Sequence, residues 1–296
     1  MRNRMAASVT ALYSLGCAVA MAAAPTAVGA PADPGKGGYT LFHPTPAALL
    51  REMNTDRPDK TESPFTVDAG HVQLELDFLT CSYDRHNPAR DDTRVRSWSV
   101  TPLNLKLGLC NSADLQFIVQ PFNRTKTSSN AAGTLTRAGG FGDFLTRLKL
   151  NLWGNDGGST ALGLMPYVKW PTARGQLGNG SVEGGLIVPF ALGLPHGWDA
   201  GVMAQFDGVR DATGRKYHPE FVHSITFGHA IIGKLAGYAE FYSSLSAERG
   251  AGWVATADLG LTYSLTANLK LDAGVNLGLT RAADDVAPFL GMSWRF

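Results

Sequence analysis

Residues 71–296 repeat one pattern, in which apolar and polar side chains alternate over about ten to fourteen residues at a time. The clearest example is "LKLDAGVNLGL", residues 269–279, where leucine, alanine and valine share one parity and Lys270, Asp272 and Asn276 share the other with glycine. Successive side chains of a β-strand point to opposite faces, so a period of two predicts strands with one apolar face. Turns rich in glycine, asparagine and aspartate separate the repeats, and the chain is predicted to be all-β.

The pattern predicts about twelve strands. They lie near residues 71–83, 95–109, 113–122, 142–153, 160–170, 182–193, 198–207, 219–229, 233–245, 253–265, 268–280 and 285–296. The last of them, "VAPFLGMSWRF", alternates as far as the terminal Phe296. Several prolines also fall within these ranges, where bulges or strand ends are expected because proline has no N–H to donate to a ladder. They are Pro102, Pro121, Pro166, Pro189 and Pro288.

The connections between the predicted strands alternate in length. "CNS", "GNDGGS", "LPHG", "AIIG" and "TA" are short, whereas "DRHNPARDDT", "NRTKTSSNAAGTLTRAGG", "TARGQLGNGS", "GVRDATGRKYHPE" and "SAERGAG" are mostly longer. Short turns on one rim and long loops on the other are typical of transmembrane β-barrels, whose short turns face the periplasm. The sequence therefore predicts that residues 71–296 form a closed antiparallel transmembrane β-barrel, with both ends of the barrel at the periplasmic rim.

The start of the chain follows a different rule. Two arginines precede an apolar stretch from Met5 to Ala24, and small residues follow, which is typical of a secretory signal. Residues 1–32 are predicted to be a signal peptide that is cleaved before Asp33. An uncleaved helical anchor and a lipoprotein signal at Cys17 are the alternatives. Beyond this segment no apolar run approaches the roughly 20 residues that a membrane-spanning helix needs, so a mature chain in a membrane would cross it as strands.

Composition excludes other classes of function. The chain is 44% hydrophobic and 17% charged, and its formal net charge is +1. Such a balance provides no overall field to attract nucleic acid, so nucleic-acid binding is set aside. After signal cleavage the remaining cysteines are Cys81 and Cys110. The predicted first hairpin separates them by too great a distance for a disulfide, and free thiols are expected.

Ionisable side chains gather on one parity of the predicted strands. That parity holds Glu75, Asp77, Lys106, Asp143, Arg147, Lys149, Lys169, Glu183, Asp199, Glu240, Asp258, Lys270, Asp272 and Arg295, and all of these except Asp199 and Arg295 are candidates for lining a lumen. Two arrangements explain the segregation. In a soluble barrel the charges would face solvent, and in a membrane barrel they would line a wet lumen, because a lysine or arginine on the lipid face costs about 2–4 kcal/mol.

The tryptophans favour the membrane. All lie near predicted strand ends, with Trp98, Trp170 and Trp253 toward the outer rim and Trp153, Trp198 and Trp294 toward the inner rim. Tryptophan prefers the level of the lipid headgroups, where its ring is in apolar surroundings and its N–H stays hydrated. A membrane girdle is therefore predicted. Trp98 and Trp153 have the lumen-facing parity unless a bulge shifts the register, for which Pro102 supplies a reason near Trp98.

Residues 33–70 precede the barrel pattern and carry mixed charges. Pro46 followed by "AALLREM" predicts a short helix. Farther along, the charged residues Asp56, Arg57, Asp59, Lys60 and Glu62 crowd between prolines. One interpretation is a solvated periplasmic linker. The other is a plug-like segment inside the lumen, where these charges would pair with those of the wall.

The stretch "TDRPDKTESPFTVDAGHVQLE", residues 55–75, resembles the opening of the transporter-like barrels grouped as the MetA-pathway of phenol degradation family. Beyond residue 75 the resemblance continues to Phe296 by strand pattern only. It implies an outer-membrane channel of a Gram-negative bacterium for passive uptake of small, aromatic or hydrophobic solutes. The family motif carries over to Asp56, Arg57, Pro58, Glu62, Ser63 and Pro64, and Asp59 and Lys60 lie within it. Phe296 resembles the terminal signal that the barrel-assembly machinery recognises.

Other chemistry finds little support in the sequence. A phospholipase-like barrel would place histidine and serine two residues apart on one strand face, but His223 directly precedes Ser224. The histidines share no spacing typical of a metal site. An enzyme, a metal and a cofactor are therefore not expected, with a lipase-like barrel and a non-conducting structural or adhesive barrel as the alternatives. The expected partners are the lipid bilayer, the barrel-assembly machinery and a small solute.

Overall fold

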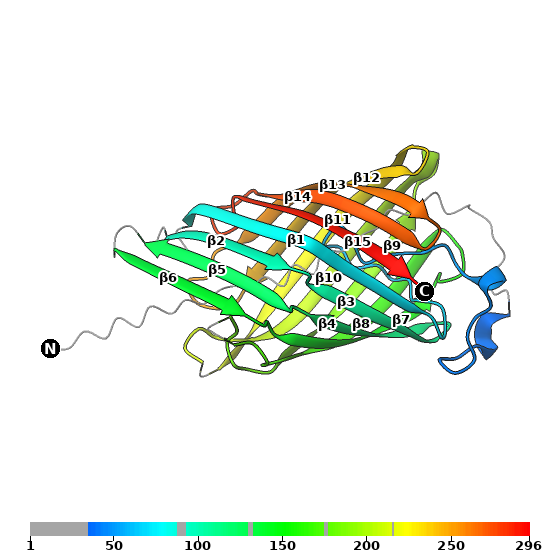
Figure 1. Ribbon diagram of the computed structural model, residues 1–296, viewed down its shortest axis with the longest axis horizontal. Coiled ribbons are helices and arrows are strands. Elements are labelled where there is room, and N and C mark those ends of the chain that lie inside the picture. The colour runs from blue at the N-terminus through cyan, green and yellow to red at the C-terminus, as the bar shows by residue number, and fades with distance from the viewer. Residues whose placement is uncertain (1–34, 88–92, 130–132, 175–176, 215) are drawn as a thin grey trace.

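The computed structural model describes residues 35–87, 93–129, 133–174, 177–214 and 216–296, so the predicted signal peptide lies outside the described residues. The strands form one antiparallel sheet that closes into a barrel, because the first strand pairs with the last (Figure 1). The strands are β1 (Val72–Asn87), β2 (Thr93–Val100), β3 (Leu103–Cys110), β4 (Ala113–Val119), β5 (Phe122–Ser129), β6 (Thr134–Gly140), β7 (Phe144–Trp153), β8 (Thr160–Trp170), β9 (Glu183–Gly193), β10 (Trp198–Arg210), β11 (Tyr217–Ile232), β12 (Leu235–Ser246), β13 (Val254–Thr266), β14 (Leu269–Gly278) and β15 (Val286–Arg295).

Three of the strands that span the wall are interrupted near their middle. β2 continues into β3, β4 into β5 and β6 into β7, so the 15 segments of the described sheet make 12 spanning strands. The first interruption is visible in the pairing of β1, whose first part pairs with β3 and whose second part pairs with β2. Thr101 at this break has a left-handed φ of 57°. The predicted closed antiparallel barrel of about twelve strands is confirmed.

The two ends of the barrel wall meet at one rim. The Val72 N–H donates to the Phe296 carbonyl over 3.2 Å, and the Phe296 N–H donates to the Val72 carbonyl over 3.0 Å. The short connections 111–112, 154–159, 194–197, 233–234 and 267–268 lie at this same rim, and the longer connections 247–253 and 279–285 lie at the other. This arrangement follows from an even number of antiparallel strands, and it agrees with the alternating loop lengths of the sequence.

Residues 123–140, predicted to be a long loop, are mostly strand. β5 and β6 form a hairpin there, and β1 likewise extends to Asn87, past the predicted end at residue 83. Both faces of these outer ends are polar, as Arg124, Thr125 and Lys126 show, so the apolar alternation that marks the other strands is missing. The loop prediction was wrong for that reason.

The prolines within the predicted strands behave in two ways. Two of them lie in the breaks before β3 and before β5, as expected, but Pro166, Pro189 and Pro288 lie inside β8, β9 and β15, where the expectation was wrong. At Pro166 the pairing of β8 with β7 skips between Tyr167 and Leu164, whereas the pairing with β9 runs through Pro166. A strand residue donates its N–H to one neighbour only, so each proline interrupts one ladder and spares the other.

The barrel is apolar outside and polar inside. On β13, Leu259, Leu261 and Tyr263 are 45–49% exposed, while the intervening Asp258 and Thr262 are 0% and 4% exposed. A soluble protein has the opposite distribution, with charged groups exposed and large apolar groups buried. The inversion fits a wall between lipid and a polar interior, and it removes the soluble-barrel alternative.

The helix predicted after Pro46 is a single 3-10 turn, η2 (Ala47–Leu49). It stops because Leu50 is extended and the next N–H, that of Arg51, donates to the Asp68 carboxylate over 3.0 Å. Two other 3-10 turns are η1 (Lys36–Gly38) and η4 (Pro195–Gly197). Within the described residues, none of the helices has the length and apolar character needed to cross a membrane.

Candidate functional site: the charged lumen

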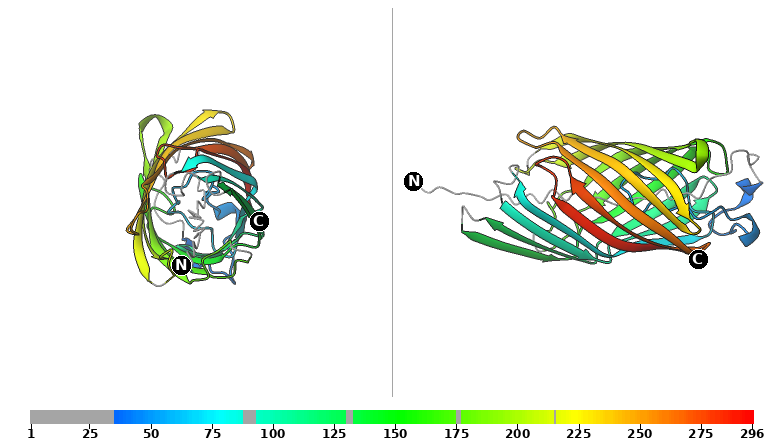
Figure 2. Two further views of the ribbon diagram at one scale, coloured as in Figure 1. Left: turned by 90° about the vertical axis from the view of Figure 1, so that its left-hand side faces the viewer. Right: turned by 90° about the horizontal axis from the view of Figure 1, so that it is seen from above.

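The chain before β1 enters the barrel. Residues 53–68, here called the inner segment, contain no helix or strand, and Figure 2 shows chain inside the ring when the barrel is viewed along its axis. The side chains of this segment are covered by the wall, with Asp56, Arg57, Asp59 and Glu62 all 5% exposed or less. A buried charge is costly unless it is paired, so each of these groups needs a partner.

Asp56 lies between two lysines of the wall. Its carboxylate pairs with Lys106 on β3 and Lys149 on β7, and it accepts a hydrogen bond from Gln116 over 3.2 Å. Its backbone N–H donates to Glu75 on β1 over 2.9 Å, and Glu75 also pairs with Lys106 at 2.5 Å. Burial disfavours the carboxylate, but the two ammonium groups outweigh burial and hold the pKa of Asp56 well below its usual range.

Arg57 contacts the neighbouring strands on the other side of Glu75. Its Nη2 is 2.6 Å from Asp77 on β1 and 2.6 Å from Asp272 on β14, and its Nε donates to Asp272 over 3.2 Å. The guanidinium also lies 5.7 Å from the ring centre of Phe289. A Cβ on Gly291 would overlap this guanidinium, so glycine is required there for the close approach.

Lys60 and Thr61 contact the strands β12 and β13. The Lys60 N–H donates to Glu240 over 2.8 Å, and its Nζ lies 3.0 Å from Asp258 and 4.5 Å from the ring centre of Tyr242. The Thr61 hydroxyl donates to Glu240 over 2.6 Å and lies 2.7 Å from the Ser224 hydroxyl of β11. The inner segment therefore contacts both sides of the barrel.

Glu62 completes the set with a pair to Arg147 of β7 at 2.5 Å. Burial raises the pKa of Glu62 to about 7, and the attraction of Arg147 offsets that effect only in part. The next residues are held through their backbone carbonyls, since Asn151 donates to Pro64 over 2.9 Å and Lys149 donates to Phe65 over 3.3 Å.

A second group of charges closes the contact at the rim where the two ends of the barrel wall meet. Lys36 and Arg51 both pair with Asp68, at 3.1 Å and 3.3 Å, and both reach Asp156 in the β7–β8 turn, at 3.0 Å and 3.3 Å. Arg295 near the chain end donates to the Arg51 carbonyl over 2.8 Å. The sequence did not predict these rim pairs, because single charges in the loops of residues 33–70 follow no periodic pattern.

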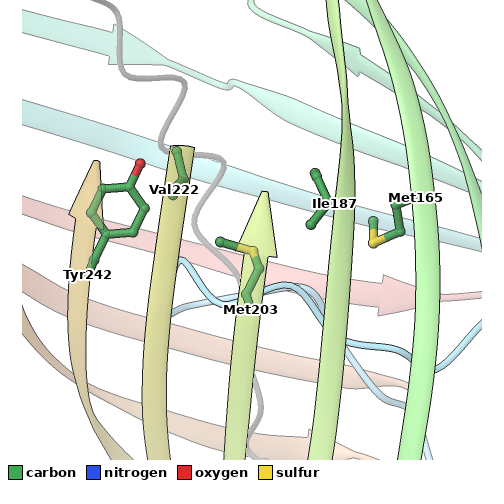
Figure 3. Packing of buried hydrophobic residues seen from close by; sticks show 5 residues of the cluster. All are labelled: Met165, Ile187, Met203, Val222 and Tyr242. Atoms are coloured by element: carbon green, nitrogen blue, oxygen red, sulfur yellow. The ribbon is translucent and has the colours of Figure 1, made fainter. Parts of the chain in front are cut away.

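One part of the lumen wall is apolar instead of charged. Met165, Ile187, Met203, Val222 and Tyr242 lie on five successive strands, β8 to β12, and pack together at 0–7% exposure (Figure 3). This row is called the apolar strip. The inner segment touches it, because the Glu62 N–H lies 3.4 Å from the Met203 sulfur. The sequence analysis chose lumen candidates by their charge alone and therefore missed the strip. Its only sequence signal is that these apolar residues occupy positions whose parity is otherwise polar.

The structure brings most lumen candidates to the inner segment. Those with a contact to it are Glu75, Asp77, Lys106, Arg147, Lys149, Glu240, Asp258, Lys270 and Asp272. The remaining three contact one another, since Lys169 lies 3.3 Å from Asp143 and 2.6 Å from Glu183. Within the motif, the Pro58 carbonyl accepts from Tyr238 over 3.4 Å, and Ser63 donates to Asn54 over 2.6 Å.

All the girdle candidates are exposed. Trp98, Trp153, Trp170, Trp198, Trp253 and Trp294 have 37–51% of their surface accessible. Trp98 reaches the outer face because of the break between β2 and β3, and Trp153 does so through an irregularity in the pairing of β7 with β8 after Asn151. Cys81 on β1 and Cys110 at the end of β3 are free.

Comparison with known families agrees with this architecture. The family model described as "Putative MetA-pathway of phenol degradation" matches residues 55–296. The chain belongs to this family. The matched range starts within the inner segment and ends at Phe296, so it covers most residues of the inner segment as well as the wall.

A solved structure of an outer-membrane channel shows a similar fold. The COG4313 outer membrane channel from Pseudomonas putida F1 aligns with a TM-score of 0.58 and 15% identity over 76% of this chain and 94% of that one. The NanC porin aligns at 0.46 and 10% over 75% and 98%, and the CymD monoaromatic hydrocarbon channel at 0.43 and 9% over 76% and 88%. At such identities the likeness concerns the fold, which is that of an outer-membrane β-barrel. No curated protein sequence matches the chain.

Proposed function

We propose that the protein is an outer-membrane channel for passive uptake of small aromatic or hydrophobic solutes, and that residues 33–70 form a plug-like segment that narrows its lumen. The observation that carries the proposal is the two-sided lumen. Ion pairs anchor the inner segment from several strands, while the apolar strip of β8 to β12 lies beside it. A solute would pass between the inner segment and this strip.

The apolar strip supports the choice of solute. Sugar and ion channels keep a hydrated polar path, whereas Met165, Ile187, Met203 and Val222 form a continuous row of apolar side chains. Methionine side chains adapt to ligands of different shape, and Tyr242 adds an aromatic ring at the end of the row. The family description, which names phenol degradation, points to the same solute class.

The inner segment is suited to movement. It is attached by ion pairs and hydrogen bonds, and it contributes no strand to the wall, so its displacement leaves every wall ladder intact. The buried charges make the docked position specific, because displacement of the inner segment would leave the wall charges without partners until water hydrates them. Gradual entry of water or solute along the apolar strip would let the segment move while water reaches these charges.

Catalysis is not part of the proposal. His223 and Ser224 are adjacent on β11 and point to opposite faces, so they cannot act as a catalytic pair. In the part of the chain that the structure describes, no group of three or more His, Cys, Asp or Glu side chains could hold a metal. We also propose that Phe296, at the end of the closing strand, is recognised by the barrel-assembly machinery.

Deletion of residues 33–65 tests the channel and the plug together. The shortened barrel should conduct more in planar bilayers and should admit larger solutes in liposome swelling with a graded panel of aromatic acids and sugars. A shorter deletion of residues 33–52 removes the rim pairs of Lys36 and Arg51 but leaves the inner segment attached to β1, so its conductance should stay below that of the longer deletion. Equal conductance of all forms would refute the proposal that residues 33–70 narrow the lumen. No conductance or swelling in any form would favour the non-conducting structural barrel.

A further inference from the structure

The outer ends of β1, β2, β5 and β6 form a ledge on the side of the barrel. These strands are neighbours in the order β1-β2-β5-β6, and they extend toward the end of the barrel away from Phe296 (Figure 1). The inward face of the ledge is covered, since Asp84, Asn123 and Thr125 are 0–8% exposed. The outward face is open and consists largely of cations.

The cations lie on one face by strand geometry. Arg96 on β2 pairs directly with Lys126 on β5, and Lys126 pairs directly with Arg137 on β6, so the three form a row across the ledge. Arg94 and Arg124 have the same parity on β2 and β5, and all five side chains are exposed. These five residues are called the cationic patch. The whole chain has a net charge of only +1, so the patch is a local accumulation.

Within the described residues, no acidic side chain compensates the charges of the patch. Like charges directly opposite one another in a sheet are destabilising, so a row of three cations requires a reason. Among the residues that the structure describes, no carboxylate forms an ion pair with any member of the patch. Arg96 instead lies 4.9 Å from the ring centre of Tyr83. The neighbouring Arg85 has a carboxylate, Asp285, at 3.1 Å.

The position of the patch identifies its surroundings. Trp98 and Phe122 lie at its inner edge on the same outer face, where Trp98 is directly opposite Arg124. Their ring centres are 5.3 Å apart, and aromatic side chains of this kind mark the headgroup level of a membrane. Arg96 and Arg94 precede Trp98 by two and four residues on β2, which places them about 5 Å and about 10 Å farther out for a strand tilted by about 40°. That depth is where the phosphate groups of outer-leaflet lipids lie.

The surface of the ledge is also hollowed. A hollow of about 550 Å³ is lined by Arg94, Arg96, Lys126, Ser128, Thr134 and Leu135. Cations and hydroxyls suit the oxygens of a phosphate and a sugar, and the leucine suits the adjoining apolar part of a lipid. A flat basic surface would attract counterions only diffusely, whereas a hollow of this composition can hold one headgroup.

We propose that the cationic patch is a binding site for a phosphorylated lipid headgroup of the outer leaflet. The site is on the outside of the barrel and does not involve the lumen. It depends on the placement of the barrel in an outer membrane, but not on which solute the channel admits. Binding there would fix the height and rotation of the barrel in the leaflet.

The test is a titration of the mature protein in detergent with lipid A, with bound lipid counted by native mass spectrometry. Substitution of Arg96, Lys126 and Arg137 by glutamine should weaken binding by about 100-fold, because each basic residue near an anionic lipid surface contributes a roughly equal share of the binding free energy. Substitution of the exposed Lys216, Lys234 and Arg249 by glutamine is the matched control and should change nothing. A heat-modifiable shift in electrophoresis shows that each barrel is folded, and Arg124→Gln provides a milder variant of the patch.

Two further arms separate the sources of phosphate. Inorganic phosphate at the same phosphate concentration should fail to displace lipid A, because the hollow also contacts the sugar and apolar parts. Displacement by inorganic phosphate would overturn the proposal in favour of a free-anion site. Equal binding by the wild type and the row variant, or no binding by the wild type, would overturn it as well. Solute uptake plays no part in this assay, so its outcome is independent of the channel proposal.

Discussion

Replacement of Asp56 by asparagine should release the inner segment. Asp56 is 2% exposed and provides a carboxylate for Lys149, which is 0% exposed. Among the described residues Lys149 also reaches the Phe65 carbonyl at 3.3 Å and lies opposite Asp114 of β4. Removing one partner of a buried ion pair costs about 3–5 kcal/mol, because the other charge stays buried and uncompensated. Lys106 keeps Glu75 at 2.5 Å, so the lower end of that range applies. A loss of about 3 kcal/mol raises the released population about 100-fold.

A buried reporter measures that population. Thr61 is 0% exposed, and a Thr61→Cys variant in a background with Cys81→Ser and Cys110→Ser can react with a membrane-impermeant maleimide only when the inner segment leaves the wall. The labelling rate should rise about 100-fold with Asp56→Asn. The control is Asp285→Asn, which makes the same chemical change in an exposed pair with Arg85, where little effect is expected. Equal rates for the two variants would refute the proposed anchoring of the segment.

Two further predictions concern the same contacts. Burial raises the pKa of Glu62 to about 7, so Glu62 binds a proton more tightly in the docked segment than in a released one. Lowering the pH from about 8 to about 5 should therefore favour docking and reduce conductance. Asp56 has a lowered pKa, so its protonation opposes docking only in more acidic solution. Glu62→Gln should flatten the dependence of conductance on pH. Conductance that rises on acidification would contradict the role assigned to Glu62. Gly291→Ala should also displace Arg57, because the added Cβ overlaps both the guanidinium and the Leu76 carbonyl. It should raise Thr61→Cys labelling more than Gly208→Ala, where a Cβ makes an ordinary contact at 3.7 Å.

The wall could be predicted from the sequence because its information is local. A period of two and alternating loop lengths determine strands, faces and rims without knowledge of which strands pair. The same method failed to predict β5 and β6, because both faces of these strands carry polar residues and the apolar–polar alternation is absent. It also treated residues 95–109 as one strand, whereas the chain breaks at Thr101.

The contacts of the lumen could be predicted only in kind. The charges of residues 56–62 suggested pairing with wall charges, but Arg57 meets Asp272, which is 215 residues away in the sequence. That pairing depends on the strand order and the stagger of the closed sheet, neither of which the alternation specifies. The apolar strip was missed for the same reason, because Met165, Ile187 and Met203 become neighbours only when their three strands are aligned.

A reversible cross-link would test most directly whether solute passes beside a movable inner segment. The Thr61 and Ser224 hydroxyls are 2.7 Å apart, so cysteines at both positions, in the background without Cys81 and Cys110, should join the segment to β11 when oxidised. Cysteines at Asn54 and Ser63, whose side chains are 2.6 Å apart within the segment, are the matched control.

The decisive measurement is the swelling rate of liposomes in an aromatic acid before and after reduction of that cross-link. We expect the oxidised Thr61–Ser224 pair to suppress swelling and the reductant to restore it, while the Asn54–Ser63 pair has no such effect. Equal swelling rates for the oxidised and reduced Thr61–Ser224 protein would contradict a route controlled by the inner segment.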